Sequence, residues 1–426
     1  MTDLMTLDIE SIAAGGDGVA RHDGLVVFVP RTAPGDRVVV RVTKKGRLAR
    51  GVVERIERAA PGRVAPECPH YEGDDCGGCQ LQHMSLNAQR EAKRRIIADA
   101  FRRIGKRDVP LPPIEGGART WRYRRKLTLA LRREAGSWRA GLHVFDDPDG
   151  VFALRDCSIA DERLVVVWRE LLGASALLPD ADRLRGSVRL LGEGASGAAF
   201  VLEGARHWPT HGEFFERSAS LGALWWIPEA GARRLLHDRR PAASTGGPGA
   251  SFGQVNAEMA ERLLAFVLDA VMAHAPATAV DAYAGTGELA AALDQRGVQV
   301  TAIEMDAEAS AASATRLDSP TRAPGVRTAG GSRSVTARVE DALAGALPAD
   351  VVVLNPPRAG VDARVAERLG ADAHVRAIIY VSCDPATLAR DVARMPAWCV
   401  ARLTAFDMFP QTAHVETVCE LVRGGA

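Results

Sequence analysis

The 426-residue sequence lacks the features of a membrane or exported protein. It has no uninterrupted apolar run of about 18 residues, which a helix needs to span a bilayer. Its first ten residues, MTDLMTLDIE, are acidic and lack the charged-then-apolar pattern of a signal sequence. It also contains no internal repeat. These absences favour an ordinary globular protein of two or three domains in the cytoplasm.

A strong net charge and a disulfide framework are also missing, since the net charge is +1 and the seven cysteines are an odd number. The cations are nevertheless clustered. Residues 37–63 carry nine Lys or Arg against two acids, residues 90–107 eight against two, and residues 119–133 seven against none. In the last run they surround Trp121 and Tyr123, which suits a surface that follows phosphates and stacks on bases. Each run alone could be a solvated face, but three of them predict a nucleic-acid partner.

The order of sequence patterns predicts three domains. In residues 1–62, β-branched runs such as LVVFVP and DRVVVRV between Gly and Pro turns indicate a small OB-type β-barrel. Residues 63–245 combine a helix over 85–105 with mixed strands and turns, and predict a central α+β domain with RNA-contacting strands. In residues 246–426 apolar strands alternate with helices, which predicts a Rossmann-like α/β domain. Within it, residues 318–336 are poor in apolar side chains and are expected to form a loop.

Polar residues follow three apolar strands of the third predicted domain. In DAYAGTGELA, Gly285 and Gly287 allow the backbone to turn tightly and approach a ligand. Glu304 ends the run VTAIE nineteen residues after Gly285 and can accept hydrogen bonds from both hydroxyls of a ribose. Asn355 begins an Asn-Pro-Pro shelf, which favours methyl transfer from S-adenosylmethionine over dinucleotide chemistry. Asp341 is either a partner of the adenine amine or an ordinary helix start.

Cys383 follows the apolar strand IIYVS and precedes DPATLARD, a helix whose positive end would point at the sulfur. The alternative to a reactive thiol at Cys383 is a buried, inert cysteine. Methyl transfer to a pyrimidine carbon needs such a thiol, because sulfur addition to C6 of uracil makes C5 nucleophilic. A base must then remove the C5 proton. Thirty-three residues farther on, HVET places His414 and Glu416 on one face of an expected strand, and a buried carboxylate can serve as that base.

Five motifs, SFGQVN, DAYAGTGEL, LNPPRAG, VSCDPATLARD and FPQTAHVET, together resemble the RNA uracil-5-methyltransferase family over residues 251–426. The resemblance implies that Cys383 is the nucleophile and Glu416 the base, and that Arg358 helps to hold the site together. It also implies a cofactor site for S-adenosylmethionine lined by Gln254, Tyr283, Glu288, Glu304, Asp341 and Asn355. The target uridine would be flipped out or single-stranded.

Three positions depart from the usual pattern of that family. Asn355 stands where Asp is usual, Glu288 where Asn is common, and Asp384 where Asn usually follows the nucleophile. An acid beside the thiol would raise its pKa, which leaves the activation of Cys383 open.

The other notable cysteines are Cys68, Cys76 and Cys79, spaced C-x7-C-x2-C, and Cys157 downstream. Four thiolates can hold zinc or an iron–sulfur cluster. Zinc sites more often use two close pairs, so three clustered cysteines and a distant one favour a cluster, with unliganded thiols as the remaining alternative. Family members that act on ribosomal RNA commonly carry a [4Fe–4S] cluster with similar spacing and a TRAM-type front domain.

These expectations combine into a monomeric enzyme that methylates C5 of a uridine in 23S ribosomal RNA through a covalent adduct between Cys383 and C6. A ribosomal substrate is favoured because the transfer-RNA branch usually lacks both the TRAM-like domain and the cluster. The alternatives are a transfer-RNA uracil-5-methyltransferase, a non-catalytic RNA-binding protein that keeps the fold, and a dinucleotide enzyme. Intact Cys383 and Glu416 argue against the non-catalytic reading.

Overall fold

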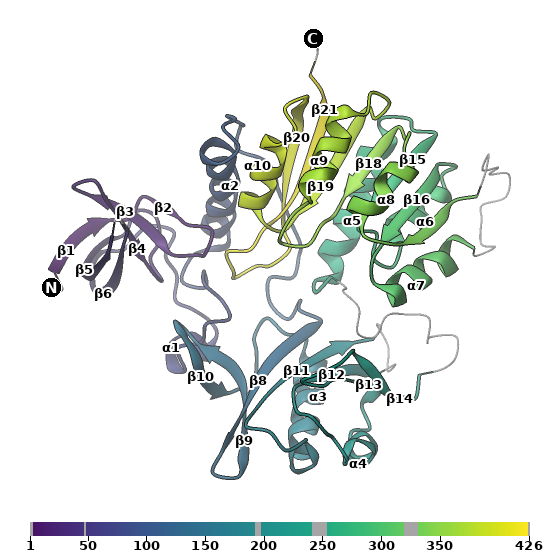
Figure 1. The fold of residues 1–426 in the computed structure, drawn as a ribbon. Coiled ribbons are helices and arrows are strands. Elements are labelled where there is room, and N and C mark those ends of the chain that lie inside the picture. The colour runs from purple at the N-terminus through teal and green to yellow at the C-terminus, as the bar shows by residue number, and fades with distance from the viewer. Residues whose placement is uncertain (1–2, 47, 192–196, 241–253, 319–330, 425–426) are drawn as a thin grey trace.

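The computed structural model describes residues 3–46, 48–191, 197–240, 254–318 and 331–424 (Figure 1). Within these ranges the chain forms three β-sheets in succession. The first three residues of SFGQVN and residues 319–330 of the expected loop lie outside them. No helix in the described ranges is long and apolar enough to cross a membrane.

The first sheet has six strands in the spatial order β1-β5-β6-β4-β3-β2. Alternation along β5 builds its core, because Val38, Val40 and Val42 are at most 1 % exposed. β1 also contacts β3, so the sheet curls on itself. A small β domain was expected here with about five strands, and six are found. They are β1 (Asp3–Asp8), β2 (Ser11–Ile12), β3 (Gly18–His22), β4 (Leu25–Val29), β5 (Arg37–Lys45) and β6 (Leu48–Arg58).

The second sheet has seven strands in the order β10-β9-β8-β11-β12-β13-β14. Leu127, Leu129 and Leu131 point from β8 into a core shared with Leu164 and Trp168 of α3. The strands are β8 (Lys126–Glu134), β9 (Ser137–Val144), β10 (Asp147–Ala153), β11 (Arg183–Leu190), β12 (Ala198–Glu203), β13 (Leu221–Ile227) and β14 (Arg234–Asp238). The helices are α1 (Pro69–Gly73), α3 (Glu162–Gly173), η1 (Ser175–Leu177) and α4 (His211–Arg217).

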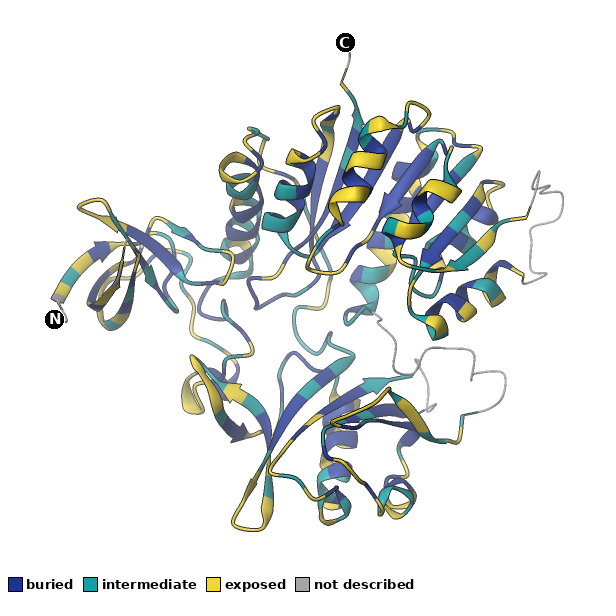
Figure 2. Cartoon of the chain, viewed as in Figure 1, coloured by how far each residue is buried: buried dark blue, intermediate teal, exposed yellow. Residues whose placement is uncertain are grey.

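The third sheet has eight strands in the order β17-β16-β15-β18-β19-β21-β20-β7, and the first five run parallel. Helices cover the sheet, and its central strands β15, β18 and β19 are buried almost throughout (Figures 1 and 2). Continuous apolar runs such as VVVL fit this position between two layers. The strands are β15 (Thr278–Ala282), β16 (Gln299–Glu304), β17 (Arg333–Thr336), β18 (Val351–Leu354), β19 (Ala377–Ser382), β20 (Trp398–Asp407) and β21 (Glu416–Arg423). The helices are α5 (Ala257–Met272), α6 (Glu288–Asp294), α7 (Ala307–Leu317), α8 (Val339–Ala346), α9 (Ala363–Ala371) and α10 (Pro385–Ala393).

Two elements from the front of the chain join this third sheet. β7 (Ile114–Gly116) pairs in parallel with β20, and α2 (Leu86–Arg103) buries Ile97 and Phe101 in the core around β18 and β19. The prediction that residues 63–245 form one central domain is therefore wrong for residues 86–116. The loop predicted over 318–336 is also wrong at its end, because residues 333–336 pair with β16 as β17.

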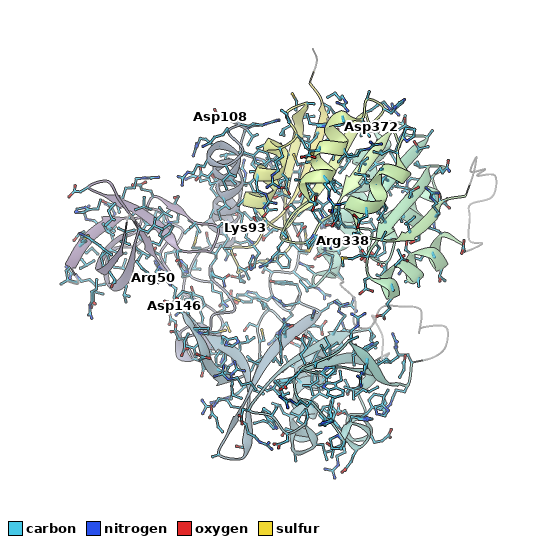
Figure 3. The ribbon with its side chains drawn as sticks, viewed as in Figure 1. Arg50, Lys93, Asp108, Asp146, Arg338 and Asp372 are labelled. Carbon is cyan, nitrogen blue, oxygen red and sulfur yellow. The ribbon has the colours of Figure 1, made fainter. Side chains whose placement is uncertain are left out.

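Ion pairs tie the first sheet to the second. Arg50 lies 3.2 Å from Asp146, and both are labelled in Figure 3. Arg31 lies 2.6 Å from Asp75, and its guanidinium stands over the ring of Phe145. These contacts hold the curled domain against the segment that carries the clustered cysteines.

We expect Phe101→Ala to lower the free energy of unfolding by about 3–5 kcal/mol, because the ring is 0 % exposed and removing it leaves a cavity. Urea denaturation followed by tryptophan fluorescence measures this, since Trp398 lies in the same core. Arg102→Ala, on the exposed side of the same helix, is the control and should change stability little. A loss below about 1 kcal/mol for Phe101→Ala would mean that α2 is not an integral part of this domain.

Candidate active site

The carboxyl ends of four neighbouring parallel strands form the candidate site. β16, β15, β18 and β19 lie side by side in that order, so the residues that follow them meet at one edge of the sheet. Those residues include the glycine loop after β15, Asn355 after β18 and Cys383 after β19. The sequence-based prediction of three converging strand ends agrees with this arrangement.

The loop after β15 has the backbone geometry of a ligand cradle. Tyr283, Gly285 and Gly287 all have positive φ, at 64°, 55° and 74°. A Cβ on Gly287 would lie 2.2 Å from the Ser313 hydroxyl, so no larger residue fits there. A Cβ on Gly285 would meet nothing within 4 Å, which leaves open space over the loop.

Glu304 holds this cradle from the next strand. Its carboxylate accepts hydrogen bonds from the backbone N–H of Gly285 at 2.9 Å and of Asp306 at 2.7 Å. Both bonds fix the carboxylate at the strand end, where the sequence places a ribose partner. Its remaining acceptor positions are free to receive hydroxyl donors.

Asp281 is a member of the site that the sequence reasoning missed. It lies in the buried part of β15, its Oδ2 has no hydrogen-bond partner, and burial raises its pKa to about 7. The nearby Glu304 carboxylate raises that pKa further. A buried, unpaired carboxyl oxygen in a ligand cradle suits a cationic or N–H donor, such as the amino group of an amino acid. An Asp within an otherwise apolar strand was the available signal.

The other predicted cofactor residues are less enclosed. Asp341 is 56 % exposed and pairs with Arg364 at 3.1 Å, and Glu288 is 66 % exposed and lies 3.9 Å from Arg316. Asn355 is exposed, and Gln254 is partly buried just before α5. The structure therefore brings Glu304 to the glycine loop, whereas Asp341 and Glu288 have ion-pair partners of their own.

Cys383 lies between β19 and α10, partly buried. The following Asp384 caps α10, because its carboxylate accepts a hydrogen bond from the Thr387 N–H at 2.8 Å. Asp384 thus directs its charge at the helix N-terminus, where carboxylates are stabilised. This gives the departure from the family pattern at Asp384 a structural role.

Glu416 is the acid that faces the thiol. Ser382 pairs with Thr417 across β19 and β21, so Cys383 and Glu416, the next residues, lie together. Burial raises the pKa of Glu416 to about 8, and Arg358 opposes that rise. Burial and the Glu416 carboxylate raise the pKa of the Cys383 thiol, while Arg358 lowers it through its charge and a hydrogen bond. The three side chains form one electrostatic unit.

His414 lies just before β21, which begins at Glu416, so the strand itself does not include it. The residue is exposed, whereas Glu416 is 4 % exposed. Partial burial of the imidazole and the nearby Arg358 lower the pKa of His414 to about 4, and Asp384 opposes that shift, so the ring lies near the neighbours of the thiol. That His414 and Glu416 share one face stays a prediction.

Arg358 is held by the loop that follows Asn355. Asp391 of α10, which is 0 % exposed, accepts hydrogen bonds from the Val361 N–H and the Tyr380 hydroxyl. The Arg358 carbonyl accepts a hydrogen bond from the Thr387 hydroxyl at 3.0 Å. These bonds fasten the loop to the same helix that follows Cys383, and so place the guanidinium beside the thiol.

The four predicted cluster cysteines are gathered in one buried group. Cys68, Cys76, Cys79 and Cys157 are each 7–8 % exposed in a single core. Burial raises the pKa of Cys76 to about 11 and of Cys79 to about 12, and the other thiols of the group add to both shifts. Such mutual influence requires the thiols to be close. Yet the described part of the chain has no three His, Cys, Asp or Glu side chains placed to hold one metal ion together.

One face of the second sheet concentrates cations. Lys126 of β8 pairs with Arg189 of β11, on the face opposite the buried leucines. Burial lowers the pKa of Lys126, and Arg189, Arg185 and Arg124 lower it further. The adjoining Arg125 N–H donates to the carbonyl of Val255 at 2.7 Å, so this basic strand lies against the start of the third domain.

Comparison with known proteins agrees with this geometry. Residues 326–423 match the tRNA (Uracil-5-)-methyltransferase family, and residues 4–52 match the TRAM domain. The 23S rRNA (uracil(1939)-C(5))-methyltransferase RlmD of Chromohalobacter salexigens is 33% identical over 98% of this chain and 89% of its own length. The corresponding Azoarcus protein is 29% identical over 97% of this chain and 99% of its own. The solved Pyrococcus abyssi tRNA (uracil-54, C5)-methyltransferase, in complex with S-adenosyl-L-homocysteine, has a TM-score of 0.70 at 21% identity, covering 98% of this chain and 99% of that one.

The Rossmann-like sheet, its glycine loop and the acid on the next strand, together with these relatives, place the chain among the S-adenosylmethionine-dependent methyltransferases. More narrowly, the chain belongs to the RNA uracil-5-methyltransferase family. The predicted family, fold class and TRAM-type front domain are confirmed. The roles of the individual site residues stay predictions.

We expect Glu416→Gln to lower the pKa of the Cys383 thiol, because a neighbouring negative charge is removed, and Arg358→Gln to raise it, because a positive charge is removed. The rate of alkylation by iodoacetamide as a function of pH, measured on the Cys383 peptide by mass spectrometry, reports the thiolate fraction. Peptide mapping separates this signal from the exposed Cys399. Shifts in the same direction for both variants would contradict the assigned contacts.

Proposed function

We propose that this protein transfers the methyl group of S-adenosylmethionine to C5 of a uridine in 23S ribosomal RNA through a covalent Cys383–C6 adduct. The observation that carries the proposal is the buried Glu416 carboxylate beside the Cys383 thiol at the carboxyl edge of a methyltransferase sheet. Methyl transfer to oxygen or nitrogen needs no thiol that adds to the acceptor ring. Transfer to C5 of uracil needs both the thiol and the base.

The two side chains divide the reaction between them. The Cys383 thiolate adds to C6, and the electrons of the C5–C6 double bond form an enolate. C5 then attacks the methyl group supplied by S-adenosylmethionine. Glu416 takes the C5 proton, the C5–C6 double bond re-forms, and the C6–S bond breaks to return the thiolate.

Electrostatics affects both the nucleophile and the base. Arg358 favours the thiolate, whereas burial and Glu416 oppose it. A Glu416 pKa of about 8 makes this carboxylate a stronger base than an exposed one. Proton removal should therefore speed up as the pH rises toward about 8, where the carboxylate form becomes dominant.

An RNA substrate fits the rest of the chain. The TRAM domain, the ion pairs that hold it against the second domain, and the crowded cations around Lys126 provide a surface for phosphates. An anion that binds between these cations reduces the electrostatic repulsion among them. Ribosomal RNA is proposed because two relatives that this chain matches over nearly its whole length are named for it. Transfer RNA is the second candidate, because the solved enzyme with the same fold is named for that substrate.

We further infer that Cys68, Cys76, Cys79 and Cys157 hold a [4Fe–4S] cluster. Their burial in one core fits four thiolates around a single group. Four thiolates are the donor set that a [4Fe–4S] cluster would take, whereas structural zinc more often uses two close pairs. The bound group would supply a fixed crosslink between the cysteine-rich segment and the second sheet. The methyl transfer itself needs no redox step.

A single chain contains the thiol, the base and the glycine loop, so we infer that the protein acts as a monomer. Its proposed ribosomal substrate would place it in the cytoplasm.

The proposed function predicts different failures for two variants. Cys383→Ala should abolish methylation while leaving RNA binding intact, because no adduct can form. Glu416→Gln should let a methylated protein–RNA adduct accumulate, because proton removal follows methyl transfer. Wild type and variants are incubated with unmodified 23S and transfer RNA and labelled S-adenosylmethionine, and 5-methyluridine is mapped by mass spectrometry.

Label at one or more uridines of ribosomal RNA, lost in Cys383→Ala, is the expected result. Full turnover by Cys383→Ala would contradict the covalent mechanism. Label confined to transfer RNA would keep the mechanism and replace the substrate. A wild type that labels neither RNA and does not bind the methyl donor would favour the non-catalytic RNA-binding protein.

The cluster assignment predicts that Cys79→Ala loses iron and the broad visible absorbance near ~400 nm that thiolate-ligated iron–sulfur centres show. Iron and sulfide content and the absorbance spectrum of anaerobically purified protein measure this. The matched control is Cys419→Ala, which removes a buried thiol from the third domain and should leave the iron content unchanged. A colourless wild type with bound zinc would contradict the assignment.

A further inference from the structure

The loop between β20 and β21, residues 408–415, leads directly into the proposed base. Its two ends are paired, because Phe406 of β20 lies opposite Glu416 of β21. The position of the Glu416 carboxylate therefore depends on how this loop leaves one strand and enters the other.

The loop receives hydrogen bonds from four separate segments of the chain. Four successive carbonyl oxygens each accept a bond from a different segment outside the loop. The pairs are Asn256 Nδ2 to Met408 O at 3.1 Å, Lys93 Nζ to Phe409 O at 2.9 Å, Tyr123 Oη to Pro410 O at 3.0 Å and Leu81 N to Gln411 O at 3.0 Å. The donors come from the start of α5, from α2, from the segment before β8 and from the cysteine-bearing segment.

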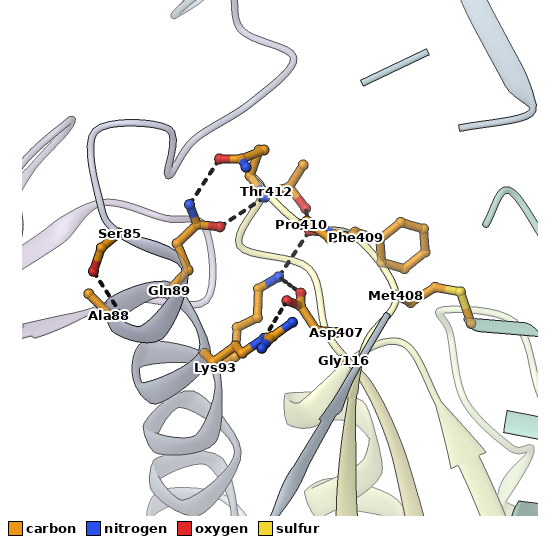
Figure 4. Close-up of polar contacts among 12 residues, drawn as sticks. Ser85, Ala88, Gln89, Lys93, Gly116, Asp407, Met408, Phe409, Pro410 and Thr412 are labelled. Atoms are coloured by element: carbon orange, nitrogen blue, oxygen red, sulfur yellow. Dashed lines mark hydrogen bonds and ion pairs between the residues drawn. The ribbon is translucent and has the colours of Figure 1, made fainter. Parts of the chain in front are cut away.

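Two residues of α2 make the strongest of these contacts (Figure 4). Lys93 is 0 % exposed, and its ammonium lies 2.6 Å from Asp407, which is also 0 % exposed and accepts a second bond from Arg90. Gln89, one turn earlier, bonds Gln411 twice: its amide nitrogen donates to the Gln411 side-chain oxygen, and its oxygen accepts from the Gln411 N–H, both at 2.9 Å.

Within the loop, Thr412 donates to the Phe409 carbonyl from its hydroxyl at 2.9 Å and its N–H at 3.3 Å. The backbone N–H and carbonyl of Gln411, by contrast, are satisfied from outside the loop, by Gln89 and Leu81. Gln411 also has a φ of 71°, a backbone conformation that a side-chain-bearing residue rarely adopts without such support. Loss of the α2 donors would leave the loop free to relax and carry the start of β21 with it.

We propose that Lys93 and Gln89 are positioning residues that hold the loop over residues 408–415 so that the Glu416 carboxylate faces C5 of the bound uracil. This inference rests on the proposed function, because it assigns to α2 a role in one step of that reaction. The step is proton removal from the methylated adduct. Addition of the thiolate and methyl transfer depend on β19 and the glycine loop, which α2 does not bond in this way.

The tests use variants that remove the contact without leaving one fully buried partner of the Lys93–Asp407 pair charged and alone. The double variant Lys93→Met with Asp407→Asn replaces the ion pair by groups of similar volume. Gln89→Met removes both bonds to Gln411 and keeps the side-chain length. The matched control is Glu420→Gln. Glu420 lies on β21 itself, away from the loop, and the substitution weakens its partly buried ion pair with His274.

Each variant is assayed with labelled S-adenosylmethionine for free methylated RNA and for label held in a denaturation-resistant protein–RNA adduct. Both α2 variants should raise the adduct-to-product ratio roughly tenfold, as a displaced general base would. Amide hydrogen exchange over residues 408–416 should quicken in the same variants. Glu420→Gln should leave the ratio at the wild-type value, whatever it does to the melting temperature.

An unchanged ratio in folded α2 variants would overturn the inference, even if turnover fell together with stability. A wild type that methylates no RNA would overturn the proposed function and this inference with it. Wild-type methylation together with adduct accumulation in Glu416→Gln but not in the α2 variants would overturn the inference alone.

Discussion

The antiparallel pairing of β21 against β19 is the constraint on which the site depends. One register places Ser382 opposite Thr417, so that the thiol after one strand meets the carboxylate at the start of the other. A slip by one residue would turn Glu416 to the opposite face of the sheet, because side chains alternate along a strand. The buried Cys419 and Leu421 on β21 hold this register from within the core.

This pairing places two groups that both prefer to be neutral beside each other. Burial raises the pKa of Glu416 and of Cys383. The negative charge of the Glu416 carboxylate makes the Cys383 thiolate less favourable still. Arg358 is the compensating cation, and it stands there because Asp391 fastens its loop to α10. Arg358 thus offsets part of the cost of charging the sulfur beside a buried acid.

The domains meet at the β20–β21 loop, which leads into the proposed base. The β20–β21 loop is bonded by α2, by the cysteine-bearing segment, by Tyr123 and by Asn256, so parts of the chain that fold around different cores converge on it. Residues 86–116 accordingly belong to the third sheet, although they precede the second in the sequence. An RNA bound across the TRAM domain and the second sheet would be presented to a site that those same parts support.

Short sequence patterns by themselves determined the fold class and part of the candidate site. The sequence shows apolar strands that are followed by Gly285, Asn355 and Cys383, and a capping residue, Asp384, before α10. These are patterns of a few neighbouring residues. They sufficed to predict the fold class, the glycine loop and the proposed nucleophile. Tertiary structure decided what depends on distant partners. Examples are the pairing of β7 with β20 and of β17 with β16, and the exposure of His414. Others are the buried Asp281 oxygen without a hydrogen-bond partner and the bonds from Gln89 to Gln411, 322 residues away. No local periodicity encodes such contacts, because they arise only when packing removes water from both partners at once.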